Sequence, residues 1–310
     1  MSLAAQTTES ADPRKGIVDF LSDFTAETTP FSAAKIDDFR EVLRPGATVF
    51  ITFLPGSDFA DTISVAARLR GEGFNPVPHL AARSIPDASF LDENLKKLKD
   101  QANIDEVLII GGAVDVPVGD FADSMQIMET GLLDKYGIKK IGVAGHPEGS
   151  PDMSDEAIAS ALEWKNAFAE RSGSELYVVT QFCFEAAPII AWDKAMQAMG
   201  NKLPIRIGIP GIATIKTLLN YSKACGIGAS ITFLKRQARN VSKLLSTSAP
   251  DKLITDLAAY KDSDPDCGLI GCHMYPLGGI KKSAKWTYAV LDGDFEMNAK
   301  KGGFRVLADI

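Results

Sequence analysis

The strongest constraint on the fold is an alternation of short apolar runs with longer helical patterns along the 310-residue chain. Eight runs have the length and β-branched content of buried strands: 18–26, 47–54, 74–81, 105–112, 138–145, 175–182, 203–211 and 267–275. Helical patterns separate them at 32–43, 59–72, 88–101, 121–135, 154–171, 185–199, 213–225, 233–246 and 251–262. Strands that alternate with helices pair in parallel through right-handed crossovers, so the sequence predicts an α/β fold.

Eight repeats favour a closed (βα)8 TIM barrel over an open, doubly wound sheet. The open sheet usually carries a glycine-rich phosphate turn after its first strand, whereas the first run here leads into the sequence TAETTP (25–30). No linker or shift in composition divides the chain. We therefore expect a flexible N-terminal tail (1–15) and a single barrel domain (16–310), in which residues 285–310 form a C-terminal extension.

Charge and composition exclude several classes of partner. The formal net charge is -7, and the 33 Lys and Arg residues are scattered, so no basic surface for nucleic acid or an anionic membrane is expected. No run approaches the roughly 18 apolar residues of a membrane helix, and the first residues lack a signal peptide, which predicts a cytoplasmic protein. The sequence has neither CxxC nor HExxH spacing, so we expect reduced cysteines and no bound metal. The cysteines are Cys183, Cys225, Cys267 and Cys272.

Polar side chains follow the carboxyl ends of most predicted strands, where barrel enzymes place their reactive groups. Any one of them could be an ordinary polar residue of the barrel rim, but together they predict a functional site at this end. These residues are Glu27, His79, Asp115, His146, Gln181 and His273.

Glu27 is a candidate proton donor. Threonines and apolar residues surround it, and Lys35 is the one basic residue within ten positions. Burial would raise its pKa towards neutrality, where a carboxylic acid can act as a general acid. Hydrogen bonds from backbone amides would instead keep it ionised, and the sequence leaves both alternatives open.

Glycine-bearing strand ends and one loop could bring backbone amides close to a large ligand. The loop at 57–62 leads into a predicted helix and could offer its amides to an anion. This arrangement suits a cofactor with phosphates, although no specific phosphate motif is present. The glycine-bearing segments are 111–119, 145–149, 210–214 and 276–279.

Three short motifs, together with VPHL (77–80), resemble the methylenetetrahydrofolate reductase family. TQFCFE (180–185) is similar to the family's TQ(F/L)FFD, AGHPEG (144–149) to its YPE(V/G)HPE, and IPGI (209–212) also matches. The resemblance extends from Glu27 to about Leu277 and corresponds to a short member with the catalytic domain alone. It implies a barrel that holds FAD and passes hydride from NADH or NADPH through the flavin to 5,10-methylenetetrahydrofolate, giving 5-methyltetrahydrofolate.

The resemblance also implies roles for individual residues. Glu27 matches the glutamate of the family's FEFFPP motif, which protonates the folate. The implied folate-binding residues are Gln181, which would hydrogen-bond the pterin, Asp115 and Phe184. The implied cofactor-binding residues are Thr52, His79, Gly112, Ala144 and His146.

Several positions depart from the family pattern and leave other functions open. TAETTP replaces FEFFPP, GGAV (111–114) replaces the segment with Arg-Gly, and Ser150 replaces a histidine. The alternatives are a flavin-independent reductase with direct nicotinamide-to-folate transfer, a lyase or aldolase, and a non-catalytic folate-binding barrel. A Schiff-base aldolase would need a lysine at a strand end, and none of the predicted strands ends in one. The reaction could run in either direction, and the composition is compatible with a homo-oligomer.

Overall fold

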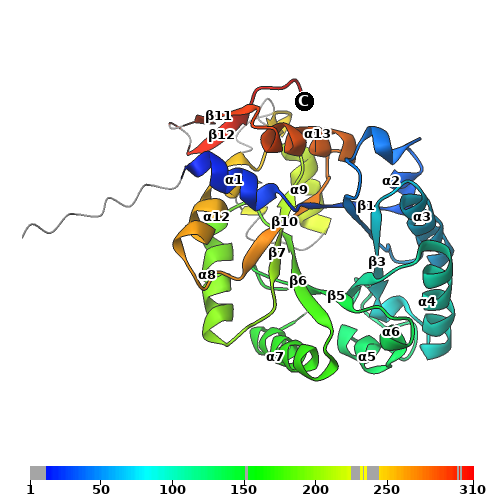
Figure 1. Cartoon of the computed structure of the whole chain (residues 1–310). Helices are drawn as coiled ribbons and strands as arrows, with labels where there is room; N and C mark the ends of the chain where they lie inside the picture. Colours follow the sequence, from blue (N-terminus) through cyan, green and yellow to red (C-terminus); the bar gives the residue numbers. More distant parts are fainter. Residues whose placement is uncertain are drawn as a thin grey trace, which may run out of the picture.

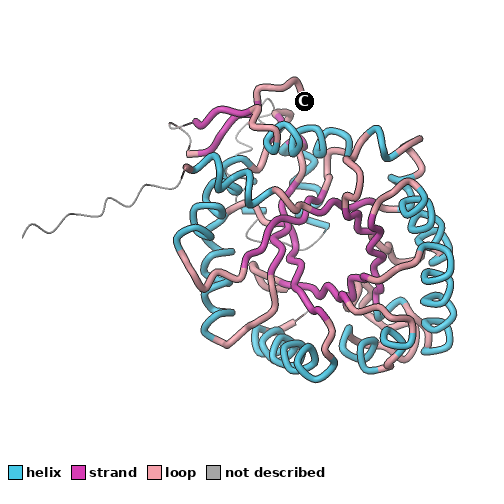
Figure 2. Tube along the Cα trace, in the orientation of Figure 1, coloured by secondary structure: helices cyan, strands magenta, loops and turns pink. Residues whose placement is uncertain are grey.

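The barrel is closed by parallel strands. A computed structural model describes residues 12–150, 153–224, 231–232, 234–235, 244–298, 300 and 302–310. Within this part of the chain, eight strands form a ring in the order β1-β10-β7-β6-β5-β4-β3-β2, which Figure 2 shows nearly end-on. The predicted (βα)8 barrel is confirmed. The strands are β1 (Thr25–Thr28), β2 (Thr48–Ile51), β3 (Asn75–Ala81), β4 (Glu106–Ile110), β5 (Lys140–Gly145), β6 (Glu175–Phe182), β7 (Ile205–Pro210) and β10 (Leu269–Tyr275).

Helices surround the ring and bury their apolar faces against its outer wall (Figure 1). None of the described helices has the length and apolar character needed to cross a membrane. Much of the predicted helix 233–246 lies outside the described residues. The main helices are α3 (Phe59–Gly71), α4 (Ala88–Ala102), α5 (Ser124–Glu129), α6 (Leu132–Lys135), α7 (Asp155–Ser172), α8 (Ala186–Ala198), α9 (Ile215–Ala224), α12 (Asp251–Ser263) and α13 (Ile280–Leu291).

The first predicted strand, 18–26, is wrong for most of its length. Residues Pro13–Leu21 form helix α1, and only β1 (Thr25–Thr28) joins the barrel. The side chain of Asp12 caps the helix by accepting from the backbone N–H of Arg14, and Pro13 occupies its first turn. Its buried residues follow helical spacing, because Ile17, Phe20 and Leu21 stand at i, i+3 and i+4.

Two other predicted boundaries also differ. The predicted helix 32–43 is reduced to two short elements, α2 (Pro30–Ala33) and the 3₁₀ turn η1 (Phe39–Glu41). Helix α1 begins at Pro13, inside the segment expected as a tail, while residues 1–11 lie outside the described part. A third short element, η2 (Ala82–Ser84), follows β3.

The C-terminal segment packs beside the N-terminal helix (Figure 1). After α13, the strands β11 (Phe295–Asn298) and β12 (Gly303–Val306) form an antiparallel hairpin. Arg14 of α1 donates hydrogen bonds to the carbonyl oxygens of Phe295 (2.6 Å) and Gly293 (2.9 Å). A second small pairing joins β8 (Ala213–Thr214) to β9 (Thr247–Ser248).

The amino-terminal end of the barrel is filled by charged groups that satisfy one another. The Tyr177 hydroxyl donates to Oε1 of Glu106 at 2.6 Å, and Nζ of Lys140 lies 3.2 Å from Oε2 of the same carboxylate. Arg206, 6% exposed, donates to the backbone and side chain of Asp23. Above this layer the interior is apolar, with Phe50, Val77, Leu108, Tyr177 and Val179 in one cluster.

Candidate active site

Glu27 and His273 form a buried pair at the carboxyl end of the barrel. Oε2 of Glu27 on β1 lies 3.0 Å from Nε2 of His273 on β10, and their exposed fractions are 8% and 0%. Thr25 lies two residues before Glu27 and therefore faces the same side of the strand. Its hydroxyl is 2.7 Å from Nδ1 of His273. The hydroxyl of Thr52, just after β2, donates to the other oxygen of Glu27.

The pKa of Glu27 depends on its neighbours as well as on its burial. Burial raises the pKa of its carboxyl group, but four effects together outweigh it. These are the hydrogen bond from His273, the charges of His79 and His273, and the hydrogen bond from Thr52. The pKa of Glu27 therefore lies below its ordinary value, because the neighbouring side chains outweigh the effect of burial. Of the two alternatives that the sequence left open, this favours the ionised carboxylate.

Thr25 lets His273 keep its hydrogen bonds in either protonation state. A hydroxyl both donates and accepts, so it can donate to Nδ1 of a neutral imidazole or accept Nδ1–H from an imidazolium. Nε2–H can donate to Glu27 in both cases. The contact of Thr25 with Nδ1 is therefore compatible with both protonation states of His273.

His79 on β3 is buried without a polar partner. It is 5% exposed, and in the described part of the chain neither of its ring nitrogens has a hydrogen bond. Burial, aided by the charge of His273 and opposed by that of Glu27, lowers its pKa to about 4, so the ring is neutral near pH 7. An unsatisfied buried polar group costs about 1–3 kcal/mol, and such groups in native proteins often have a functional explanation.

Aromatic rings surround the histidines. The ring centroid of Phe50 lies 4.5 Å from that of His273 and 6.1 Å from that of His79. Tyr275 contacts His273 edge-on at 4.8 Å, and its hydroxyl donates to the carbonyl oxygen of Thr180. These rings pack around the carboxylate–histidine pair and give it a dry, low-dielectric surrounding.

Gln181 and Phe184 lie near the end of β6, in another part of the strand ring. Gln181 is half-buried near the end of β6, which β10 and β7 separate from β1. The carbonyl oxygen of Gln181 accepts from the hydroxyl of Thr180 at 2.9 Å, and the Phe184 ring contacts Phe182 at 5.8 Å. Both lie at the same end of the barrel as Glu27.

Asp115 and Gly112 belong to the loop after β4. Asp115 is exposed, so its side chain is not part of the buried cluster. Gly112 has φ +96°, and a Cβ there would lie 3.3 Å from Cβ of Ala81, which explains the glycine at this turn. The loop is held by a hydrogen bond from the N–H of Val118 to the carbonyl oxygen of Arg83.

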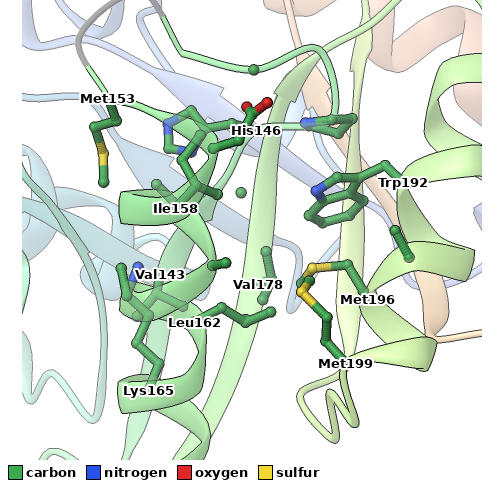
Figure 3. A pocket seen from close by; sticks show the side chains of 18 of the residues that line it. Val143, His146, Met153, Ile158, Leu162, Lys165, Val178, Trp192, Met196 and Met199 are labelled. Carbon is green, nitrogen blue, oxygen red and sulfur yellow. The ribbon is translucent and has the colours of Figure 1, made fainter.

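Ala144 and His146 lie at the end of β5. Both are half-buried, and both line a cavity between α7 and α8, outside the barrel wall (Figure 3). Of the predicted residues, the structure therefore joins Glu27 directly to Thr52 and places His79 close enough to act on its charge.

Sequence reasoning placed His273 at the rim but gave it no role, and it missed Thr25, Phe50 and Tyr275. Two of these could have been found from strand periodicity, since Thr25 and Tyr275 each lie two residues from a candidate side chain on the same strand. The contact between His273 and Phe50 depends on the register of the strands around β1, which the local sequence does not specify.

Metal and thiol chemistry find little support in the described residues. No group of three or more His, Cys, Asp or Glu side chains there could hold a metal ion. Burial raises the pKa of the Cys183 and Cys272 thiols, so they stay protonated and are poor nucleophiles. Cys225 lies outside the described residues.

Fold and site together define a (βα)8 barrel with a buried carboxylate–histidine pair at the carboxyl ends of its strands. No model of a known protein family matches the sequence. A segment of 87 residues, 28% of this chain, is 32% identical to methylenetetrahydrofolate reductase 2 of Saccharomyces cerevisiae. That match covers only 14% of the yeast protein.

Two solved structures resemble the barrel distantly. A dihydropteroate synthase from Thermus thermophilus is 12% identical with a TM-score of 0.40, over 87% of this chain and 93% of that one. A probable 3-DHS dehydratase from Bacillus anthracis is 12% identical with a TM-score of 0.33, over 84% of this chain and 97% of that one. Similarity at this level carries no information about activity.

Proposed function

We propose that this protein is an enzyme that interconverts 5,10-methylenetetrahydrofolate and 5-methyltetrahydrofolate, with NADH or NADPH as the source of hydride. The observation that carries the proposal is the buried pair of Glu27 and His273, 3.0 Å apart, at the end of the barrel where substrates bind. The partial similarity to the yeast reductase and the TQFCFE segment (180–185) support the choice of a folate.

The reaction requires one proton and one hydride. Protonation of the N10 nitrogen opens the five-membered ring of the methylene folate and leaves an iminium at N5. Hydride then adds to the methylene carbon and gives the methyl group. The protein must therefore present a proton donor to N10 and hold the pterin in register with the hydride source.

Glu27 and His273 can supply this proton as a unit. In the loaded form, Nδ1–H of the imidazolium donates to Thr25 and Nε2–H donates to the Glu27 carboxylate. Transfer of the Nε2 proton to Glu27 neutralises both groups and creates a carboxylic acid, which gives its proton to N10. In the opposite direction the same pair accepts the proton.

Some cofactor positions fit a flavin, and others favour its absence. The free ring nitrogens of His79 and the glycine turn at Gly112 could meet a polar ring system. A bound FAD would relay hydride between the nicotinamide and the folate. In contrast, Thr52 already donates to Glu27 and Asp115 is exposed, which favours direct transfer from nicotinamide to folate.

A spectrum and a turnover assay test the proposal together. Purified protein is incubated with FAD, desalted, and scanned for flavin absorption, and folate-dependent oxidation of NADH and NADPH is then followed with and without FAD. Turnover is expected. Retained flavin that nicotinamide bleaches and methylenetetrahydrofolate restores identifies the flavin route, whereas turnover by colourless protein identifies direct transfer. Folate binding without turnover under any of these conditions would overturn the enzyme proposal in favour of a non-catalytic folate-binding barrel.

A further inference from the structure

A large apolar cavity lies outside the barrel, between α7 and α8 (Figure 3). Its volume is about 500 Å³, within the range of small-molecule sites. Val143 of β5 and Val178 of β6 form its floor. Its two walls carry apolar side chains: Ile158 and Leu162 from α7, Trp192 and Met196 from α8, and Met199 directly after α8.

Small residues keep the cavity open. Ala159 and Ala161 of α7 and Ala195 of α8 also line it, so neither helix fills the space with large side chains. At Gly145, a Cβ would lie 2.5 Å from Val178 and 3.3 Å from Trp192, so the glycine permits the indole ring to pack against the strand. Open apolar concavities of this kind are typical of ligand sites.

Lys165 of α7 also lines this cavity. The residue is 8% exposed, and within the described ranges its ammonium group makes no hydrogen bond or ion pair. Burial lowers its pKa to about 8 against the opposing effect of Asp123, so most molecules still carry the charge at pH 7. A buried, unpaired charge is unfavourable, and an anion beside it would remove that cost.

We propose that this cavity binds a small carboxylic acid with an apolar body, with its carboxylate at Lys165 and its chain against Val178, Trp192 and Met196. The apolar walls accept the chain, and Lys165 selects the anion. Asp155 and Glu156 also line the cavity and would repel a ligand with several negative charges. The proposed ligand therefore carries a single anionic group, and the site is separate from the Glu27 cluster.

Calorimetry with decanoate and decanol tests the charge selection, because the two probes share a chain and differ in the head group. Below the concentration at which decanoate forms micelles, wild-type protein is expected to bind it at least tenfold more tightly than decanol. Lys165→Met should weaken decanoate binding at least tenfold and leave decanol within twofold. Lys194→Met is the matched control, since Lys194 is exposed on α8 and does not line the cavity. Equal affinity for the two probes, no binding, or unchanged decanoate binding by Lys165→Met overturns the proposal.

A cavity-filling variant tests the location independently. Ala195 is exposed on α8, so Ala195→Trp should fold and block the cavity, removing the binding of both probes. Decanoate binding that survives this substitution would place the ligand elsewhere and overturn the proposal. A dimer that Ala195→Trp disrupts, in a protein that binds neither probe, would make the cavity an interface between copies and would also overturn it.

Discussion

The two ends of the barrel each contain a buried carboxylate, and the partners of these carboxylates differ in kind. At the amino-terminal end, Glu106 accepts a hydrogen bond from Tyr177 and lies beside Lys140. At the carboxyl end, Glu27 is bonded to His273 and Thr52. Histidine is the side chain whose charge changes most readily near neutral pH.

The difference shows that burial of a carboxylate does not by itself indicate a catalytic role. The Glu106 network is complete and holds the strands together at a closed end. The Glu27 network can exchange a proton, and beside it His79 has two ring nitrogens without partners. Native proteins keep buried polar groups without hydrogen bonds mainly where a bound ligand forms the missing bonds. This difference is why we propose the carboxyl end as the functional end.

The largest effect on turnover is expected when the carboxylate of Glu27 is replaced by an amide. The same substitution at Glu106 is the comparison. Glu27→Gln removes the proposed proton donor, so the proposed turnover should fall by about 10²–10⁴-fold. Glu106→Gln alters a buried carboxylate of the same size far from the site and should leave turnover within a few-fold. Steady-state kinetics with circular dichroism as the folding control measure both. Similar losses in the two variants would remove the distinction between the ends.

The next effect concerns stability against pH. In the folded protein the pKa of His79 is about 4, below the ordinary 6.5, so the unfolded chain binds the extra proton first. Above pH 6.5, His79 therefore does not lower the free energy of unfolding. As the pH falls from 6.5 to 4, it lowers this free energy by about 3 kcal/mol. Urea unfolding across this range should show the loss in wild type and in Glu106→Gln. His79→Leu should not show this loss of stability. If the free energy of unfolding of His79→Leu depended on pH as it does in wild type, the prediction would be contradicted.

His273→Gln tests the role of the histidine in positioning and charging Glu27. Without the hydrogen bond and charge of His273, the pKa of Glu27 should rise, because these lower it in wild type. The limb of kcat/KM that falls with rising pH should nevertheless move to lower pH, because a carboxylic acid alone loses its proton at lower pH than the imidazolium that loads the pair in wild type. We expect kcat to fall by about 10²-fold, the lower end of the general-acid range. Tyr177→Phe, which loses a hydrogen bond at the other end, should leave the pH profile unchanged. An unmoved limb in His273→Gln would show that the histidine has only a packing role.

The smallest effect is expected from Tyr177→Phe on stability. The substitution leaves one oxygen of Glu106 without its buried donor, which should cost about 1–3 kcal/mol in the free energy of unfolding. Chemical denaturation measures this, while turnover should remain within twofold. A large loss of turnover with unchanged stability would mean that the amino-terminal network reaches the site after all.

Local sequence predicted most of the barrel because strand and helix periodicities are short-range signals. It failed at α1, whose apolar residues resemble a strand when counted as a run and a helix when their spacing is considered. Glu27, Thr52 and His79 were predicted from three different strands and lie in one cluster. The predicted barrel places the last strand beside the first, but the hydrogen bond of Glu27 with His273 was not predictable, because it depends on the register of β1 and β10. The cavity at Lys165 depends on the packing of two helices, which strand and helix patterns do not specify.

The separation of Glu27 and His273 by 246 positions has a consequence for the order of folding. The carboxylate is synthesised early, whereas its histidine belongs to the last strand of the ring. A nascent chain can therefore form most of the barrel wall while the site still lacks its proton-sharing partner. Closing a loop of this length is an entropically costly late contact. We expect the pair of Glu27 and His273 to assemble with the closure of the barrel, so a chain halted before β10 would contain the carboxylate without its histidine.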